Sequence, residues 1–236
     1  MDVSLRKALN CVDAPADEAS VLRHFFGFLD GRPVGLGTIS VRDQLEALRG
    51  DHVHLDIMLV VPEDFVANDL LELAFGIQGA RDILGQVGIG IGRVRYHEIT
   101  RDQADGAEVI TSKGEAKRLT RRFRGSSDDA MDVFMVPQYN VFSGGENKIG
   151  ICSIPTCFKN HYVFNGCVIG FNNNNGPISA PKMPRLLAHE LGHGLGRIHR
   201  NISGNLMESD GFGTSLTEGQ GRRMRRDCFV QDGCDI

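Results

Sequence analysis

The sequence lacks both the long hydrophobic run of a membrane span and the positive charge typical of nucleic-acid-binding proteins. Its longest apolar stretches, such as Ile57–Pro62, are far shorter than the roughly 20 residues of a transmembrane helix. The 26 basic residues are outnumbered by 30 acidic ones, which gives a formal net charge of −4. These absences predict no membrane span and no nucleic-acid partner. The 236 residues are 41% hydrophobic and 24% charged, which is typical of a globular protein with a real core.

The six cysteines show no CxxC spacing, which argues against a thiolate zinc site and against a redox motif. Clustered cysteines without metal spacing indicate disulfides, and disulfides indicate a secreted or periplasmic protein. Fifteen pairings stay open, although Cys228 and Cys234 are close enough in sequence to join near the C-terminus. Met1–Asn10 lacks the apolar stretch of a secretory signal. Either the signal has been removed, or export follows another route, or the protein stays inside the cell.

From residue 51 onward, the hydrophobic pattern alternates between strand and helix. The predicted elements are, in order, strand Val53–Val61, helix Asn68–Leu84, strand Ile89–Ile99, helix Lys113–Phe123 and strand Ala130–Pro137. Such alternation predicts crossover connections and a mostly parallel sheet. Short strands are expected at Lys148–Ser153 and Cys167–Phe171, and a further helix begins after Pro184.

Residues 1–50 do not continue this alternation. They contain two short helical patterns, Glu18–Phe26 and Val41–Leu48, separated by a glycine-rich turn. We therefore place a boundary after residue 50 and expect residues 51–236 to form the main domain.

The most informative stretch is residues 189–199, which read HELGHGLGRIH. On a helix, His189 and His193 project from the same face, one turn apart, where both can bind one metal ion. Glu190 lies about 100° around the helix axis, near enough to reach a water on that ion but not the ion itself. Gly196 ends the helix, because glycine accepts the left-handed conformation that reverses the chain and returns His199 as a third ligand. Three neutral imidazoles leave one position of a tetrahedral zinc open, as a catalytic site requires.

The alternative is that three histidines fall by chance around an ordinary core helix. The helix has a separate apolar face for packing, made of Leu186, Leu187, Leu191, Leu195 and Ile198. Because this face suffices for burial, the histidines are not needed for it, and the metal-site interpretation is the better one.

Residues 189–199 resemble the zinc signature of the metzincin metallopeptidases. This clan has a second element, a tight Met-turn whose methionine forms a hydrophobic floor beneath the zinc. Residues 204–207 fit this element, with Met207 eight residues beyond His199. The spacing is most like that of the matrixins. The residue after the third histidine often marks the family within the clan, and here Arg200 matches none of the families compared. Ser209 stands where some families have a tyrosine that can reach the zinc, so no tyrosine ligand is expected. The family within the clan therefore stays open.

The resemblance implies an α+β fold with an α/β-like upper subdomain, about residues 51–196. It implies a twisted, mostly parallel five-stranded sheet with an antiparallel edge strand, two backing helices and the active-site helix. A small lower subdomain, about residues 197–236, would hold the Met-turn and a last helix. Thr217 and Gln220 resemble the capping box that opens this helix, with Met224 and Phe229 packing inward.

The resemblance further implies a zinc-dependent endopeptidase that is monomeric and acts on extended protein or peptide substrates. Zinc would polarise the scissile carbonyl and activate a water, with Glu190 as general base. The substrate would pair with an edge strand near Cys167–Phe171, although an ordinary edge strand explains this segment equally well. Two alternatives from other classes are a binding or adhesion module with a structural zinc, and a zinc amidase acting on cell-wall peptides.

Two further hypotheses concern ligands outside this core. Several metzincins are kept latent by a pro-segment, and Cys11 and Asp13 in residues 1–50 offer a sulfur and an oxygen for the zinc. Binding through Cys11 would leave an odd number of cysteines, which Asp13 avoids, but a solvated acidic turn is the simpler interpretation. Asn172–Asn175 offer oxygens for calcium, although a turn accounts for them in the absence of nearby carboxylates.

Overall fold

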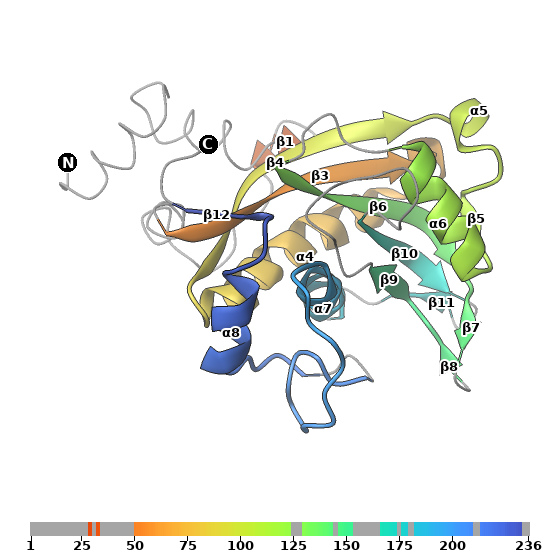
Figure 1. Cartoon of the computed structure of the whole chain (residues 1–236). Helices are drawn as coiled ribbons and strands as arrows, with labels where there is room; N and C mark the ends of the chain where they lie inside the picture. The colour runs from red at the N-terminus through yellow and green to blue at the C-terminus, as the bar shows by residue number, and fades with distance from the viewer. Residues whose placement is uncertain are drawn as a thin grey trace, which may run out of the picture.

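The computed structural model describes residues 28–29, 32–33, 50–123, 129–143, 146–152, 166–173, 176–178, 182–209 and 213–232. Within these residues, eight strands form one sheet (Figure 1). Its five principal strands lie in the spatial order β4 (Ile89–Ile99), β3 (Asp51–Val60), β6 (Ala130–Tyr139), β10 (Cys167–Asn173) and β9 (Gly150–Cys152). The first four are parallel, and β9 pairs with β10 in the antiparallel sense. The predicted α+β architecture is therefore confirmed.

The alternation predicted from residue 51 is also confirmed, with small shifts at the element ends. The strand β3 begins two residues before the predicted strand and stops before Pro62, which opens the 3-10 helix η1 (Pro62–Asp64). The predicted helices appear as α4 (Ala67–Gly85) and α6 (Lys113–Arg122). A capping box fixes the start of α6, because Ser112 Oγ accepts from Glu115 N at 3.2 Å while the Glu115 carboxylate accepts from Ser112 N at 3.2 Å.

The helices α4 and α6 lie on opposite faces of the sheet (Figure 1). The strand β4 lies on one side of β3 and β6 on the other, so right-handed crossovers place the two connecting helices on opposite faces. Residues of β3 alternate accordingly. Leu55 and Ile57 face a core shared with α4 and α7 (Met183–Gly194), whereas Met58 and Val60 face α6.

The edge strand predicted near Cys167–Phe171 is wrong in position. Those residues belong to β10, which is paired on both sides, with β6 and with β9. The antiparallel edge strand is β9, which falls within the segment predicted at Lys148–Ser153. A disulfide joins Cys152 of β9 to Cys167 of β10 across directly opposite positions of the ladder. This bond ties the short edge strand to the interior of the sheet.

Several short elements were not predicted. They are the hairpin β1 (Phe28–Leu29) with β2 (Arg32–Pro33), the helix α5 (Arg101–Ala104), and the strands β5 (Val109–Ile110), β7 (Phe142–Ser143), β8 (Glu146–Asn147), β11 (Gly176–Pro177) and β12 (Val230–Gln231). The helices predicted at Glu18–Phe26 and Val41–Leu48 lie outside the described residues. Asn172 and Asn173 form part of the β10–β11 hairpin, and Asn172 Nδ2 donates to Pro137 O at 3.2 Å.

The C-terminal part follows the prediction closely. The helix α8 (Glu218–Met224) begins at a capping box in which Thr217 Oγ accepts from Gln220 N and Gln220 Oε1 accepts from Thr217 N. Met224 and Phe229 are buried in the same core as α4 and α7. Among the described residues, no helix has the length and hydrophobicity needed to span a bilayer.

Candidate metal centre

The helix α7 carries the first two histidines and is packed tightly against α4. It begins at Met183, one residue before Pro184, which occupies the first turn where a missing N–H is harmless. A Cβ atom built on Gly79 of α4 would lie only 2.3 Å from Pro184 Cβ, so the two helices approach through a glycine. Leu187 and Leu191 are fully buried on the face of α7 that meets this core. The packing therefore fixes the rotation of α7 and the direction in which His189 and His193 point.

The chain reverses at Gly196, as the sequence predicted. Gly196 has φ of +73°, in the left-handed region that a residue with a side chain rarely adopts. Its N–H donates to His193 O at 3.0 Å, and the next N–H, of Arg197, donates to Gly192 O at 2.9 Å. These two bonds are those of a Schellman motif, which ends the helix and turns the chain back toward its last turn. The reversal brings His199 beside the two helical histidines.

The three imidazoles meet through their Nε2 atoms. His199 Nε2 lies 3.2 Å from His189 Nε2 and 3.1 Å from His193 Nε2. The opposite ring nitrogens are held by backbone carbonyls, with His189 Nδ1 at 2.6 Å from Leu206 O and His193 Nδ1 at 2.7 Å from Arg197 O. Because a carbonyl only accepts, these two Nδ1 atoms carry the proton and the Nε2 lone pairs point toward a common centre.

This arrangement fits zinc. Two nitrogens bound tetrahedrally at about 2.0–2.1 Å from zinc would be about 3.3 Å apart, close to the separations of His199 Nε2 from the other two Nε2 atoms. The three histidines form the one group of potential metal ligands found among the described residues. His189 is buried, His193 is half-buried and His199 is exposed, so the centre is open to solvent on one side.

The surroundings of two of the imidazoles, those of His193 and His199, favour the neutral form. Burial, chiefly, lowers the pKa of His193 to about 4, and His189 and His199 add smaller repulsive effects. Burial also lowers the pKa of His199, and the positive charge of Lys148 lowers it further. Neutral imidazole is the form that coordinates a metal, so the site is prepared for a cation at ordinary pH.

Glu190 is buried next to the edge strand. Its carboxylate lies so close to β9 that a Cβ atom on Gly150 would be 3.0 Å from Glu190 Oε1. Its Oε2 has no hydrogen-bond partner within the described residues, and burial raises the pKa of Glu190 to about 8. A buried carboxylate without donors is unfavourable unless it is protonated or has a cation near it. An orphaned oxygen on the residue that follows His189 is therefore a second feature that fits a metal ion.

Met207 lies beneath α7 and is fully buried. A Cβ atom on Gly192 would be 2.6 Å from Met207 Sδ, so the sulfur occupies the space that this glycine leaves. Two backbone bonds shape the turn around it, because Glu208 N donates to Asn205 O at 3.0 Å and Arg200 N donates to Met207 O at 2.7 Å. The same segment presents Leu206 O to His189, so the turn that carries Met207 also orients an imidazole.

The residues proposed for latency, Cys11 and Asp13, lie outside the described residues. Ser209 is exposed. The sequence interpretation missed the carbonyls of Leu206 and Arg197 and the role of Gly150. Backbone atoms carry no residue signature, and Gly150 has no feature in the sequence that distinguishes it from the other glycines. Only the position of β9 against α7 reveals it.

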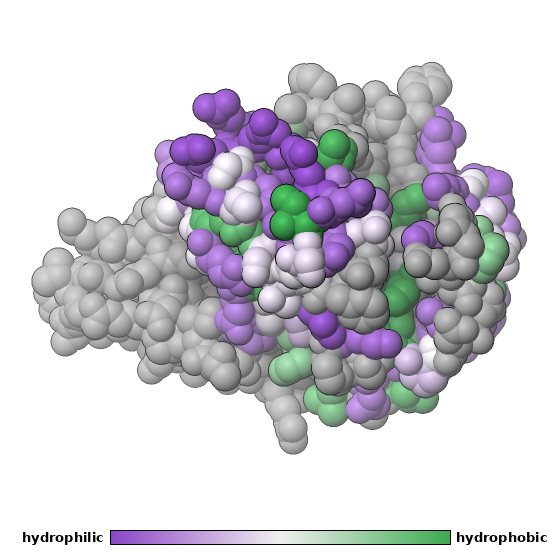
Figure 2. Space-filling model, turned by 90° about the horizontal axis from the view of Figure 1, so that it is seen from below, coloured by the Kyte–Doolittle hydropathy of each residue, from purple (hydrophilic) through white to green (hydrophobic). Residues whose placement is uncertain are grey.

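The surface around the third histidine is strongly polar. Figure 2, which views the molecule from below, shows hydrophilic residues gathered over the region of α8 and the segment that follows α7. A pocket of about 350 Å³ lies here and is lined largely by arginine side chains. Burial lowers the pKa of Arg197, the positive charges of Arg223 and Arg200 lower it further, and Asp227 partly compensates.

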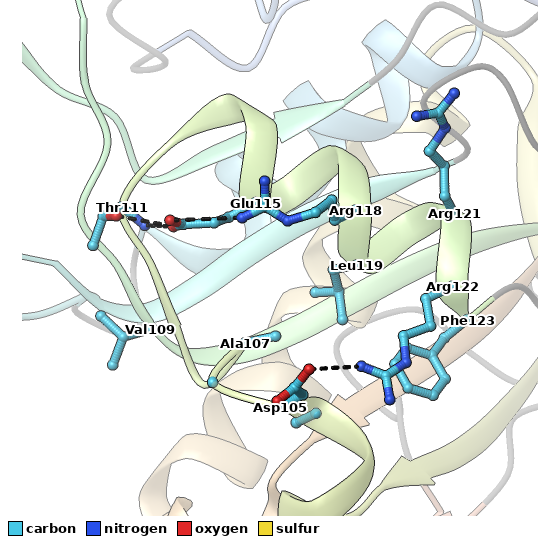
Figure 3. A pocket seen from close by; sticks show the side chains of 12 residues that line it. Asp105, Ala107, Val109, Thr111, Glu115, Arg118, Leu119, Arg121, Arg122 and Phe123 are labelled. Atoms are coloured by element: carbon cyan, nitrogen blue, oxygen red, sulfur yellow. Dashed lines mark hydrogen bonds and ion pairs between the residues drawn. The ribbon is translucent and has the colours of Figure 1, made fainter.

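A separate cavity of about 720 Å³ lies between α6 and residues 104–111 (Figure 3). Charged side chains of its rim have partners within the protein. The Glu115 carboxylate accepts from Thr111 N at 2.7 Å, and Arg122 Nη1 lies 3.5 Å from Asp105 Oδ2. This cavity borders the helix that covers the sheet face opposite α7, and it shares no lining residue with the histidine centre.

No protein-family model matches the chain, and no curated protein matches it significantly. Among solved structures, the chain is similar to metalloproteinase-II from Bacteroides fragilis, with 14% sequence identity, a TM-score of 0.49, and coverage of 75% of this chain and 53% of that chain. It is also similar to archaemetzincin from Methanopyrus kandleri, with 11% identity, a TM-score of 0.48, and coverage of 73% of this chain and 94% of that chain. The chain thus spans about half the length of the Bacteroides fragilis protein.

Proposed function

We propose that the protein is a zinc-dependent endopeptidase of metzincin type, with His189, His193 and His199 as zinc ligands and Glu190 as general base. The observation that carries this proposal is the convergence of three imidazole Nε2 atoms. The residue after the first of these histidines is Glu190, a buried carboxylate whose Oε2 has no hydrogen-bond partner among the described residues. Residues 51–236 would form the catalytic unit, with an upper part at about 51–196 and a lower part at about 197–236. The disulfide Cys152–Cys167 is compatible with a secreted or periplasmic location.

The chain's own residues supply orientation and proton transfer. Leu206 O and Arg197 O hold two imidazoles in the tautomer that ligates through Nε2. When bound, zinc supplies a Lewis acid that polarises the scissile carbonyl and lowers the pKa of water. Glu190, whose carboxylate is buried, takes a proton from the attacking water and passes it to the leaving amine.

The edge strand β9 offers a place for the substrate. Among the described residues, β9 pairs only with β10, so its outer edge has no strand partner there. Gly150 of β9 lies against Glu190, which places this edge beside the proposed base. An extended peptide that adds to the edge would form backbone hydrogen bonds and bring a peptide bond to the centre. This position for the substrate replaces the one expected from the sequence along Cys167–Phe171.

The experiment that tests the proposal is hydrolysis of a casein-type protein by the full chain. We expect cleavage that a zinc chelator abolishes and added zinc restores. Glu190→Gln should retain zinc and lose at least about a hundredfold in rate, whereas the exposed Glu98→Gln should retain activity. Tight zinc binding with no hydrolysis of any amide would indicate a binding or adhesion module. Hydrolysis restricted to cell-wall peptides would indicate an amidase.

Latency remains a prediction of its own. If residues 1–50 form a pro-segment, a chain beginning at residue 51 should be more active than the full chain. Equal activity of the two folded proteins would discard the hypothesis. If the chain beginning at residue 51 is more active, substitution of Cys11 or Asp13 in the full chain would identify which side chain blocks the centre.

A further inference from the structure

An arginine-lined pocket includes the two residues that flank Ile198 and His199 in the sequence, and the side chains of this pocket have no part in the proposed mechanism. It is formed by the segment after α7 and by α8, and its volume is about 350 Å³. We call it the arginine pocket and define it by its five cationic side chains, Arg197, Arg200, Arg222, Arg223 and Arg226. Figure 2 shows the hydrophilic surface over this part of the molecule.

The positive charge of the pocket is poorly balanced. Arg222 lies 3.3 Å from Glu218, and both side chains of this pair are exposed. In the part of the chain that the structure describes, no carboxylate forms an ion pair with Arg200, Arg223 or Arg226. Five cations on so small a surface therefore leave a local excess of positive charge, although the whole chain is acidic.

The arginines are close enough to repel one another. Arg197 experiences the charges of both Arg223 and Arg200, and its Nε is buried with no hydrogen-bond partner in the described chain. Arg197 Nη2 donates to Gly196 O at 2.5 Å, which places its guanidinium at the end of α7. Asp227 offsets part of the charge of Arg197 and Glu218 pairs with Arg222, but repulsion among the remaining charges costs free energy that an anion in the pocket would relieve.

The pocket is connected to the centre through the backbone. Arg197 and Arg200 lie on either side of His199 in the sequence, and Arg197 O accepts from His193 Nδ1. A ligand in the pocket would therefore lie beside the segment that holds the third histidine. The volume suits one or two acidic side chains.

We propose that the arginine pocket binds an acidic side-chain segment of the peptide substrate and gives the enzyme a preference for Asp- and Glu-containing sequences. Planar guanidinium groups match carboxylates through paired hydrogen bonds, so several arginines around one small pocket favour this ligand. The inference rests on the proposed function, because it assigns a substrate class to that centre.

The first test measures binding without turnover. A dye-labelled oligoglutamate peptide is titrated against the full-length Glu190→Gln protein and followed by fluorescence anisotropy. We expect binding that weakens as salt rises and that falls about tenfold or more in Arg223→Gln/Arg226→Gln. Both arginines are exposed, so the variant should fold, and its melting temperature checks this. Three results would overturn the proposal. The first is tighter binding of a phosphoserine peptide than of oligoglutamate. The others are tighter binding of an anionic vesicle or an oligonucleotide than of oligoglutamate, and unchanged binding of oligoglutamate by the variant.

The second test compares turnover of two peptides that share a cleavable core. One peptide carries a neutral extension and the other an acidic extension. The pair is made in two forms, one with the extension before the core and one with the extension after it. We expect a higher kcat/KM for an acidic peptide, and a loss of most of that preference, about tenfold, in Arg223→Gln/Arg226→Gln. Arg118→Gln, which removes an exposed cation of α6, should keep the preference.

The two tests fail in distinguishable ways. If neither peptide is cleaved, the proposed function fails, and the anisotropy titration still decides whether the pocket binds carboxylates. If the wild-type protein cleaves both peptides equally well, the proposed function stands and the inference about the arginine pocket is overturned.

Discussion

Asn205 and Gln220 hold each other through two reciprocal hydrogen bonds between their buried side-chain amides. Asn205 Nδ2 lies 2.9 Å from Gln220 Oε1, and Gln220 Nε2 lies 2.9 Å from Asn205 Oδ1. Asn205 Oδ1 also accepts from Met207 N at 3.1 Å. The pair therefore connects the turn beneath the candidate metal centre to the first turn of α8.

Replacement of Gln220 by alanine should destabilise the protein by about 2–3 kcal/mol. The change leaves the buried amide of Asn205 without its partner and removes half of the capping box with Thr217. Urea unfolding measures the loss. Lys117→Ala, an exposed change in α6, should stay within about 0.5 kcal/mol of the wild-type value. A loss for Gln220→Ala no larger than that of Lys117→Ala would contradict this account of the pair.

Replacement of Gly150 by alanine should lower the turnover rate about 10- to 100-fold while leaving the zinc content unchanged. The new methyl group would lie 3.0 Å from Glu190 Oε1 and 3.1 Å from Val168 O, so the carboxylate must move from its position. Steady-state kinetics and metal analysis on the same sample measure both effects.

The matched control is Gly114→Ala in α6. Its Cβ atom would meet nothing nearer than 3.7 Å, so activity should be unchanged, and the helix should gain up to about 1 kcal/mol of stability. If Gly150→Ala is as active as Gly114→Ala, then Gly150 does not position the carboxylate.

Much of the fold could be predicted because local chemistry sets the ends of its elements. The strand at Ile89–Ile99 was predicted at both ends. It follows Gly88, which has φ of +71°, and it stops before Thr100, the N-cap of α5. The order of strands at the sheet edge could not be predicted, because hydrophobic periodicity does not say which strands pair. For that reason the sequence predicts the edge strand at Cys167–Phe171, whereas the structure has it at the three-residue β9.

The histidine centre was accessible from the sequence for a similar reason. The helical period alone places His189 and His193 on one face, and a glycine marks the reversal before His199. The arginine pocket was not accessible in this way. Arg197 and Arg223 are 26 positions apart in the sequence, and only the packing of α8 beside the end of α7 brings them together.

Loss of the disulfide between Cys152 and Cys167 should lower the free energy of unfolding by about 3 kcal/mol. The two cysteines are 15 positions apart, and closing a loop of that length restricts the unfolded chain by about this amount. Denaturation of a Cys152→Ser/Cys167→Ser variant measures the effect, and the variant avoids reducing the other cysteines. Activity should fall as well, because β9 lies against Glu190. An unchanged unfolding midpoint would contradict the assigned pairing.

The burial of Glu190 should make the metal-free protein less stable as pH rises. The pKa of Glu190 is raised by burial from an ordinary value of 4.5 to about 8, so the folded state holds a proton between these values that the unfolded state has released. The free energy of unfolding therefore falls by up to about 4 kcal/mol as pH rises from about 4.5 to about 8. Glu190→Gln has no proton to release at this position, so this pH dependence should disappear in the variant. Without metal, the variant should be as stable as the wild type at pH 4.5 and more stable than the wild type at pH 8. Urea denaturation of chelator-treated samples across this range measures the difference, and Glu98→Gln provides an exposed control that should follow the wild type. The same pH dependence in Glu190→Gln and wild type would show that the carboxylate is not held in an unfavourable environment, which would remove one of the two features that fit a cation at this site.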